Sequence, residues 1–301
     1  MDLAARAKRM VLASLAGDAL ALGAHWEYDP DMLAEKHGRM TQYQTPAPGS
    51  YHDGKKAGDF THYGDQTLVL LESLAARGTF DLMDFFERWK ALFDGYKGYV
   101  DGATRQTLDI IAFGEGPGSS GSHSNDLAGA SRIAPLLPVY RDDLDGLLAA
   151  AAAQTKMTHN NALILDSASF FARAGWLALH GAEPAAAMDE AAKAGYQSAP
   201  IREWVTDGLA SVDEDTTTAI GRFGRTCHVP EAFPGAVHVA AKYADDLAAG
   251  LTACVMAGGD SAARALLAGM LLGSAENAVL PGSWISGFTR QKDIAEMLEK
   301  L

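Results

Sequence analysis

Four short stretches of the sequence bring together side chains that could take part in chemistry. The first, residues 17–29, reads GDALALGAHWEYD and holds Asp18, His25, Trp26 and Glu27. Carboxylates and an imidazole beside an indole are typical of a pocket for a nucleotide or a sugar. The structural alternative is a helix end at which Asp18 bonds to nearby backbone and Trp26 belongs to the core.

The second stretch, residues 57–74, reads AGDFTHYGDQTLVLLESL. Asp65 stands where the apolar run begins, so it could cap a helix or occupy its first turn. A carboxylate is stabilised there by free backbone amides and by the helix dipole, and capping explains Asp65 as well as a site does. His62 and Tyr63 come just before it, on the loop side, where they could reach a ligand.

The third stretch combines residues 124–136 (SNDLAGASRIAPL) with residues 155–162 (TKMTHNNA). A Gly/Ser-rich loop before a helix offers backbone amides to an anion. Arg132 could then pair with a phosphate, or instead with Asp126. His159 precedes two asparagines that are typical of a helix N-terminus. The candidate binding residues of this stretch are Asn125, Gly129, Arg132 and His159.

The fourth stretch, residues 256–273, reads MAGGDSAARALLAGMLLG. Gly258 and Gly259 allow the backbone to approach a ligand or another segment closely. Asp260 is expected to be the N-cap of a helix that begins at Ser261. A capped, buried helix explains this pattern as well as a functional site does.

Composition limits the classes of function. The chain has 301 residues, of which 48% are hydrophobic, and a formal net charge of −13. Such a surface is unsuited to displacing counterions from nucleic acid. We expect no membrane partner, because no apolar stretch approaches about 20 residues and the N-terminal segment lacks the pattern of a secretory signal. Cys227 and Cys254 are the only cysteines, and we expect two reduced thiols in a cytoplasmic protein.

The elements that must position these residues are helices. Apolar residues recur at helical spacing, and no alternating strand pattern persists beyond a few residues. We therefore predict an all-α protein with a single domain over residues 1–301. The expected helices are 3–16, 65–78, 81–95, 102–113, 143–155, 163–181, 183–195, 238–256, 261–273 and 290–300.

Three segments are expected to be irregular. Residues 37–63 form the longest of them, and loops of that length inside a compact domain are usually functional or mobile. Residues 114–126 are flexible by composition. In residues 227–251, which lead into the Gly-Gly-Asp segment, Pro230 and Pro234 bound a loop that is predicted to be a rigid connector. The alternative for that segment, which also holds Phe233, is a lid or wall over a sugar, with His228 as the candidate residue.

Taken together, the order and spacing of these stretches resemble the ADP-ribosylglycohydrolase family, from about residue 10 to residue 286. The resemblance implies an all-α orthogonal helical bundle and hydrolysis of a glycosidic bond at the anomeric carbon of ADP-ribose. It also implies two magnesium ions that hold the ribose hydroxyls and the attacking water. The matching segments are Gly17-Asp18-Ala19-Leu20, Glu72-Ser73-Leu74, Arg132-Ile133-Ala134-Pro135, Thr158-His159, Gly258-Gly259-Asp260 and Leu280-Pro281-Gly282-Ser283-Trp284.

The sequence departs from this family at the positions that would hold the metal. His25 stands where the family has a glutamate, with Glu27 two residues later. Thr61-His62-Tyr63-Gly64 stands where the family has Thr-Asp-Asp-Thr, unless a shifted alignment places Asp65 at one aspartate. After Asp260, the family's Thr-Asp-Thr is replaced by Ser261-Ala262-Ala263.

These departures predict that the two-magnesium centre is lost. Two divalent ions in a partly buried site need compensating carboxylates. Asp260 with Asp65 or Glu27 could hold at most one ion, so no cofactor, magnesium included, is expected to be essential. The imidazoles of His25 and His62 suit a transition metal better than magnesium.

We interpret the sequence as a hydrolase of an ADP-ribosyl or related ribosyl substrate. Glu27 or Asp65 would orient water, His25 or His62 would move protons, and Asp260 would stabilise the sugar cation. Two alternatives stay open: a catalytically inactive protein that binds ADP-ribose or another nucleotide-like small molecule, and a structural relic with an empty pocket. The expected binding residues are Asp18, Trp26, Tyr63, Asn125, Gly129, Arg132, His159, Gly258, Gly259 and Ser261.

Overall fold

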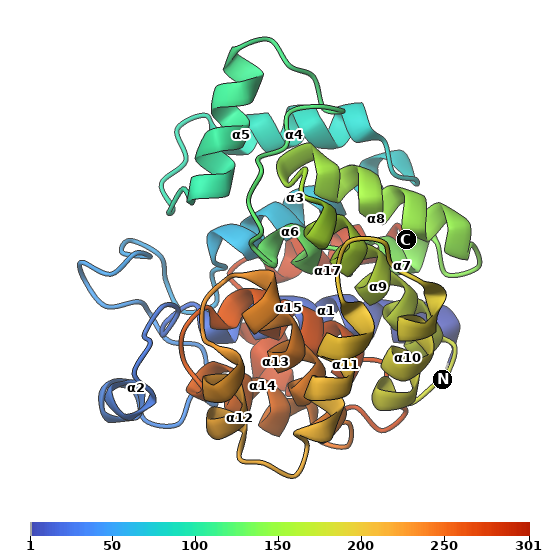
Figure 1. Ribbon diagram of the computed structural model, residues 1–301. Coiled ribbons are helices and arrows are strands. Elements are labelled where there is room, and N and C mark those ends of the chain that lie inside the picture. The colour runs from blue at the N-terminus through green and yellow to red at the C-terminus, as the bar shows by residue number, and fades with distance from the viewer. Residues whose placement is uncertain (1) are drawn as a thin grey trace.

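The computed structural model describes residues 2–301, and its regular elements over these residues are helices joined by loops, with two isolated β-bridges. Residues with high helix propensity dominate the sequence, as this architecture requires. The helices, shown in Figure 1, are α1 (Leu3–Ala21), α2 (Pro30–His37), α3 (His62–Arg77), α4 (Leu82–Phe93), α5 (Gly102–Ala112), α6 (Ala128–Ser131), α7 (Leu136–Val139), α8 (Leu144–Thr158), α9 (Ala162–Leu179), α10 (Pro184–Ala191), the 3₁₀ helix η1 (Ala192–Ala194), α11 (Ile201–Ala210), α12 (Thr216–Phe223), α13 (Val229–Lys242), α14 (Leu247–Met256), α15 (Ser261–Leu272), α16 (Gly282–Gly287) and α17 (Gln291–Glu299).

The prediction of an all-α protein is confirmed, and two local predictions were wrong. The expected helix over 238–256 is two helices, because the chain breaks before α14, where Asp246 caps the amide of Ala249. The expected loop around Pro230 and Pro234 is instead the first half of α13. Pro230 lies in its first turn, where a missing N–H costs nothing, and Pro234 is accepted inside the helix. The short helices α2, α6, α7, α11, α12 and α16 were not predicted.

The centre of the molecule is the close packing of α1 against α15. A Cβ added to Gly269 would lie 2.4 Å from the carbonyl oxygen of Ala13, and one added to Gly17 would lie 2.4 Å from that of Ala265. The two backbones therefore touch, and Ser14 Oγ donates to the carbonyl of Leu266 at 2.8 Å. Figure 1 shows both helices in the middle of the bundle, with other helices around them. This contact fixes the C-terminal end of α1 relative to the start of α15.

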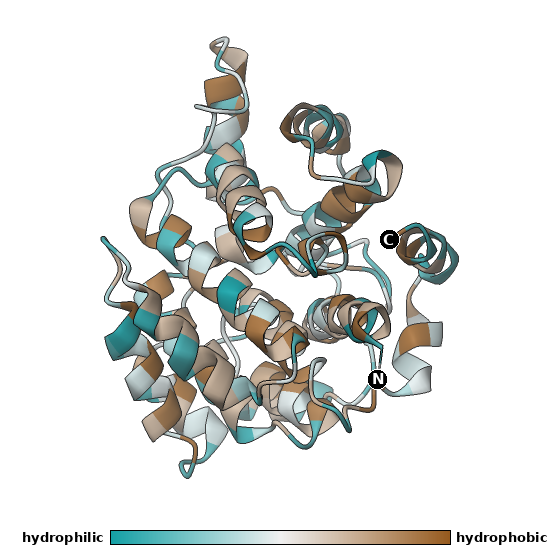
Figure 2. Cartoon of the chain, turned by 90° about the vertical axis from the view of Figure 1, so that its right-hand side faces the viewer, coloured by the Kyte–Doolittle hydropathy of each residue, from teal (hydrophilic) through white to brown (hydrophobic). Residues whose placement is uncertain are grey.

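The outer helices bury one side only. In α17, Ile294, Met297 and Leu298 are buried while the charged residues stay exposed. Figure 2 shows polar and apolar residues side by side on this helix, next to the label C. One helix of the described residues, α9, is long and apolar enough to cross a membrane by length and composition. It packs against α8 and α10, and 56% of its residues are buried inside the protein.

Backbone hydrogen bonds tie three chain segments together beside the start of α15. The amide of Trp26 donates to the carbonyl of Gly259 at 3.0 Å, and the amide of Gly259 donates to the carbonyl of Glu27 at 2.7 Å. The amide of Asp260 donates to the carbonyl of Arg225 at 2.8 Å. The first and fourth chemically rich stretches of the sequence therefore meet at the start of α15, together with the segment around Arg225.

Candidate functional site

Asp260 is the centre of the candidate site. It occupies the N-cap position of α15, as predicted, but its side chain does not cap the helix. Instead, its Oδ2 atom accepts hydrogen bonds from Trp26 Nε1 and from Tyr63 Oη, both at 3.0 Å. The residue is fully buried and its Oδ1 atom has no hydrogen-bond partner. Burial raises the pKa of Asp260, and these donors partly oppose that rise.

Trp26 reaches Asp260 through an unusual backbone conformation. Its φ is 69°, the only positive φ of a non-glycine residue in the part of the chain that the structure describes. Such strain persists where the surroundings enforce it, and it is found most often at functional sites. Here the bonds between Trp26 and Gly259 hold the turn in place. The indole is half-buried, so the alternative in which Trp26 belongs to the core is wrong.

A cluster of three histidines lies beside Asp260. The ring centroids of His25, His52 and His62 are 5.3 to 6.3 Å apart. His25 Nε2 and both ring nitrogens of His52 and His62 are buried without a hydrogen-bond partner. Burial lowers the pKa of His52 to about 3, that of His62 to about 4 and that of His25 well below its ordinary value. The cluster is therefore neutral at physiological pH, and its inward-facing nitrogens are free to meet a ligand.

His62 faces a second carboxylate. Its Nε2 atom lies 3.6 Å from Oδ2 of Asp101, which caps α5 by accepting from the amide of Thr104 at 2.8 Å. The hydroxyl and amide of Thr104 and the neighbouring His62 favour the ionised carboxylate, and the pKa of Asp101 is lowered despite its burial. Asp101 was not a sequence candidate, because its spacing before α5 indicates only a helix cap.

Asp126 and Cys227 were also missed, and both lie next to Asp260. One ligand atom from each of the three residues falls within a mutual distance of 4.8 Å. Tyr63 Oη also lies 3.3 Å from Asp126 Oδ2, so the two carboxyl groups share its single hydroxyl proton. Burial and the other carboxylate raise the pKa of Asp126 well above its usual value. In the sequence Asp126 was considered only as a partner for Arg132.

Asp18 positions the start of α3. Its Oδ2 accepts from the amide of Thr61 at 2.7 Å and its Oδ1 from the hydroxyl of Thr61 at 2.6 Å. Burial raises the pKa of Asp18 to about 7. A Cβ on Gly64 would lie 2.3 Å from this carboxylate, which explains why glycine follows Tyr63. The alternative in which Asp18 makes only local bonds is wrong, because Thr61 is 43 positions away.

The third stretch contributes mainly structural residues. Arg132 is buried and donates to Gln154 Oε1 at 2.6 Å, to Gln66 Oε1 at 3.0 Å and to Thr158 Oγ1. These bonds engage it with neutral groups, so the predicted pairing with Asp126 is wrong. His159 is buried against Gly129, and its Nε2 atom has no partner.

Asn125 lies at the outer edge of the site. Its Oδ1 atom is 2.7 Å from His228 Nδ1, and its carbonyl accepts from the amide of Val229 at 2.9 Å. The amide of Leu127 donates to the carbonyl of Cys227 at 2.9 Å. Two segments far apart in the sequence are thereby paired, and this pairing places Asp126 beside Cys227.

The glycines of the fourth stretch permit close backbone approach, as predicted. A Cβ on Gly258 would lie 2.8 Å from the carbonyl oxygen of Glu27, and one on Gly259 would lie 2.2 Å from that of Arg225. Both residues have positive φ. The carbonyl of Gly258 also accepts from the buried Arg264, which the sequence did not single out. Ser261 is buried and its hydroxyl has no partner.

Glu27 and Asp65 have partners away from Asp260. The carboxylate of Glu27 pairs with Lys36 at 2.5 Å, and this contact lowers its pKa. Asp65 pairs with Lys55 at 2.5 Å and also accepts from Tyr96 Oη. Asp65 lies in the first turn of α3, where Thr61 is the cap. The structure therefore brings His25, His62, Trp26 and Tyr63 to Asp260, and it does not bring Glu27 or Asp65.

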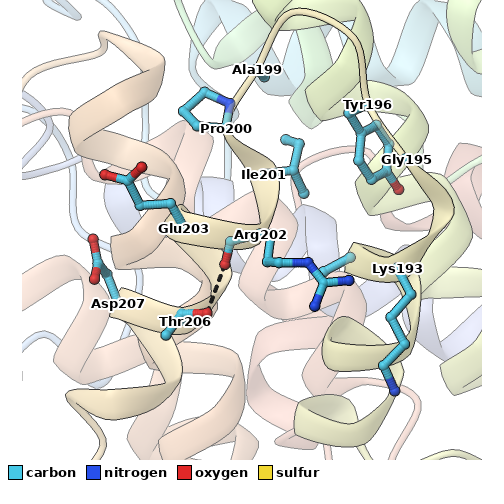
Figure 3. Close-up of a pocket in the computed structure, with 11 residues that line it drawn as sticks. Lys193, Gly195, Tyr196, Ala199, Pro200, Ile201, Arg202, Glu203, Thr206 and Asp207 are labelled. Atoms are coloured by element: carbon cyan, nitrogen blue, oxygen red, sulfur yellow. Dashed lines mark hydrogen bonds between the residues drawn. The ribbon is translucent and has the colours of Figure 1, made fainter.

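A cavity of about 570 Å³ lies elsewhere, between η1 and α11. Figure 3 shows Lys193, Tyr196 and Arg202 around it, with Thr206 Oγ1 donating to the carbonyl of Arg202. None of the predicted site residues lines this cavity. It also lacks a buried group without a partner, so the Asp260 region is the better candidate.

Comparisons with known proteins show the family and the fold of the chain. The model of the ADP-ribosylglycohydrolase family matches residues 1–301. Two proteins of Tripedalia cystophora, crystallin J1A and crystallin J1B, are each 24% identical to the chain. Each alignment covers 98% of this chain and 96% of the crystallin. A solved structure of an ADP-ribosylglycohydrolase-related protein complex aligns with a TM-score of 0.73 and 23% identity, over 99% of this chain and 98% of that one. The last likeness establishes the fold.

Proposed function

The chain belongs to the ADP-ribosylglycohydrolase family, and from this premise we propose that it hydrolyses a glycosidic bond of an ADP-ribosyl or related ribosyl small molecule at Asp260. One observation carries the proposal. Asp260 Oδ1, His25 Nε2 and both ring nitrogens of His62 are buried without hydrogen-bond partners, next to Trp26 and Tyr63, which donate to Asp260. Polar atoms so placed are costly unless a ligand or ordered water meets them.

The residues around Asp260 do not fit two magnesium ions. Magnesium takes octahedral oxygen ligands, mostly carboxylates and water. Over residues 2–301, the one group of His, Cys, Asp or Glu side chains with ligand atoms within 4.8 Å contains a thiol, and Asp65 is paired with Lys55. Tyr63 and Trp26 present hydrogen-bond donors to Asp260 where further carboxylates would be needed. The proposed hydrolysis therefore uses no magnesium.

The side chains can divide the chemistry among them. Asp101 holds His62, which accepts a proton from water as the water oxygen bonds to the anomeric carbon. The glycosidic bond breaks with its electron pair leaving on the acceptor atom, and the proton returns from His62 to that atom. The carboxylate of Asp260 stabilises the positive charge that develops on the sugar. Trp26 offers a face on which a base or sugar can stack.

Access to this site requires part of the loop between α2 and α3 to move. Tyr51 packs edge-on against Trp26 with centroids 4.9 Å apart, and His52 stacks on Trp26 at 5.6 Å. In Figure 1 this loop runs, in blue, on the left of the molecule. Its two ends are tied down by hydrogen bonds from Trp284 Nε1 to Thr41 and from the amide of Thr289 to Gly58. The segment between them carries the lid residues Tyr51 and His52.

The proposal is tested by turnover. Purified protein is incubated with a panel of ribosyl substrates, including ADP-ribosyl-arginine, ADP-ribosyl-serine and free N-ribosyl compounds, and the released sugar is quantified. We expect product from at least one substrate at a rate that excess magnesium does not raise. Absence of product from the whole panel, or turnover that appears only with magnesium, contradicts the proposal.

A second function is a binding protein without turnover. It is favoured by the closed packing of Tyr51, His52 and Tyr99 over Trp26. The names of the two crystallin relatives also mention no enzymatic activity. It predicts that ADP-ribose raises the unfolding temperature, because a ligand that binds only the folded state stabilises it by RT ln(1 + [L]/Kd), while no substrate of the panel is cleaved.

A further inference from the structure

We infer that Asp126, Cys227 and Asp260 form a site for one transition-metal ion of the zinc type. The inference depends on metal binding alone, so it stands or fails independently of the proposed hydrolysis. One oxygen of each carboxylate and the Cys227 sulfur lie within 4.8 Å of one another. A point therefore exists within about 2.8 Å of all three atoms, and shifts of less than about 1 Å reach the usual zinc distances of about 2.0 Å to oxygen and about 2.3 Å to sulfur.

The backbone holds the three ligands in place before any ion binds. Leu127 and Cys227 are joined by the amide-to-carbonyl bond of 2.9 Å, and Asp126 pairs with His228 in a β-bridge. The amide of Asp260 donates to Arg225, two residues before Cys227. Three segments distant in sequence are therefore fixed at one point, which lowers the cost of assembling the site.

Two buried atoms without partners point to a ligand at this place. Asp260 Oδ2 is engaged by Trp26 and Tyr63, so its Oδ1 atom is left free, and it is fully buried. The side chain of His25 is 0% exposed, and its unpartnered Nε2 atom lies 3.9 Å from Asp260 Oδ2. Two buried carboxyl groups this close repel each other when ionised, and a divalent cation between them removes that repulsion.

The donor set selects the kind of ion. A thiolate with two carboxylates suits zinc and similar ions and does not suit magnesium. Three protein ligands leave the fourth tetrahedral position for water or for an oxygen of a substrate. The Nδ1 atom of His25 accepts from the amide of Ala262 at 3.4 Å, which leaves the ring proton on Nε2, the atom that lies 3.9 Å from Asp260 Oδ2. On binding, Cys227 releases its thiol proton to solvent.

Cobalt substitution tests the site directly. Protein freed of metal by dialysis against a chelator is titrated with Co²⁺ alone, and the near-ultraviolet charge-transfer band of a cobalt–thiolate bond is recorded. We expect one equivalent of Co²⁺ to saturate the band. Added Zn²⁺ should displace the Co²⁺ and remove the band. Cys227→Ser is expected to abolish the band, whereas Cys254→Ser, which changes the other cysteine, keeps it.

A second variant keeps the test valid if Cys227→Ser fails to fold. Asp126→Asn is expected to retain the thiolate band but to weaken Zn²⁺ binding by about 100-fold. Loss of an outer-shell partner costs about 10- to 100-fold, and loss of a direct ligand should cost at least as much. Circular dichroism checks the fold of each variant. A wild-type titration without a charge-transfer band, a band that survives in folded Cys227→Ser, or a band that requires Cys254 overturns the inference.

Discussion

The hydroxyl of Tyr63 lies 3.0 Å from Oδ2 of Asp260, although the two residues are 197 positions apart in the sequence. Tyr63 stands in the segment Thr61–Gly64, which the unshifted alignment of the sequence analysis matches to the family's Thr-Asp-Asp-Thr. A carboxylate this close to Asp260 would need a cation between the two, whereas a phenol donates a hydrogen bond and needs none. The contact therefore gives the buried Asp260 a neutral hydrogen-bond donor at a position where the resemblance implies a carboxylate.

Removing this hydroxyl should weaken the folded state. Tyr63→Phe takes a donor from Asp260 and from Asp126, and we expect it to lower the free energy of unfolding by about 1–3 kcal/mol. Denaturant titration measures the effect. Tyr51→Phe is the control, because Tyr51 is 60% exposed. Loss of its hydroxyl should change the free energy of unfolding by less than about 0.5 kcal/mol. Equal effects of the two variants would refute the role given to the Tyr63 hydroxyl.

Packing at the centre of the molecule can be tested with a glycine pair. In Gly269→Ala the new Cβ lies 2.4 Å from the carbonyl oxygen of Ala13, so α1 and α15 must separate at a cost of about 1–3 kcal/mol. Gly102→Ala adds a Cβ with no heavy atom within 4 Å at the start of α5, and it should raise stability by up to about 1 kcal/mol. Thermal unfolding of both variants checks the pair. A stable Gly269→Ala variant would contradict the close helix crossing.

Acid should destabilise the protein partly through His238. This buried residue is bonded to Ser211 Oγ at 2.7 Å and to Thr216 Oγ1 at 3.1 Å, and burial lowers its pKa to about 4. Between about pH 6.5 and pH 4 the unfolded chain binds a proton that the folded chain does not. Stability therefore falls as the pH falls through this window, by up to about 3 kcal/mol from this residue.

The variant His238→Gln should show a shallower loss of stability on acidification, as measured by denaturant titration at pH 7 and at pH 4.5. His123→Gln, a change at an exposed histidine, serves as the control and should keep the wild-type slope. If His238→Gln and the wild type lose the same free energy between the two pH values, His238 is not a source of the acid sensitivity.

The pair His62 and Asp101 can be separated kinetically. His62→Gln removes the proposed base, and we expect kcat to fall by about 10²- to 10⁴-fold. Asp101→Asn keeps an oxygen to cap α5 but loses the charge 3.6 Å from His62. As a positioning change it should lower kcat by about 10-fold with little change in KM or in unfolding temperature. A change confined to KM would contradict this role.

The sequence predicted the helical class, and it singled out His25, Trp26, His62 and Tyr63, which the structure places near Asp260. It did not predict the contribution of Asp126 and Cys227. These residues are far apart in the chain and meet only through the pairing of residues 125–127 with residues 227–229. Neither residue belongs to a motif that could have been recognised.

Asp65 and Glu27 were predicted to lie at the site, and the local backbone geometry turns both side chains away from Asp260. Asp65 follows Tyr63 by two positions, a rotation of about 200° around the helix axis, so the two side chains point to opposite sides of α3. Glu27 follows the positive φ of Trp26, after which its backbone bonds to Gly259 and its side chain turns to Lys36. Backbone reversal at a non-glycine residue has no reliable sequence signal.

The most direct test of the central claim is the rate at which Asp260→Asn cleaves the best substrate of the panel, measured beside its affinity for ADP-ribose. The account predicts that kcat falls by at least about 100-fold, because the charge that stabilises the sugar cation is gone, while ADP-ribose still raises the unfolding temperature of the variant. A variant that retains the wild-type kcat would show that the chemistry does not take place at Asp260.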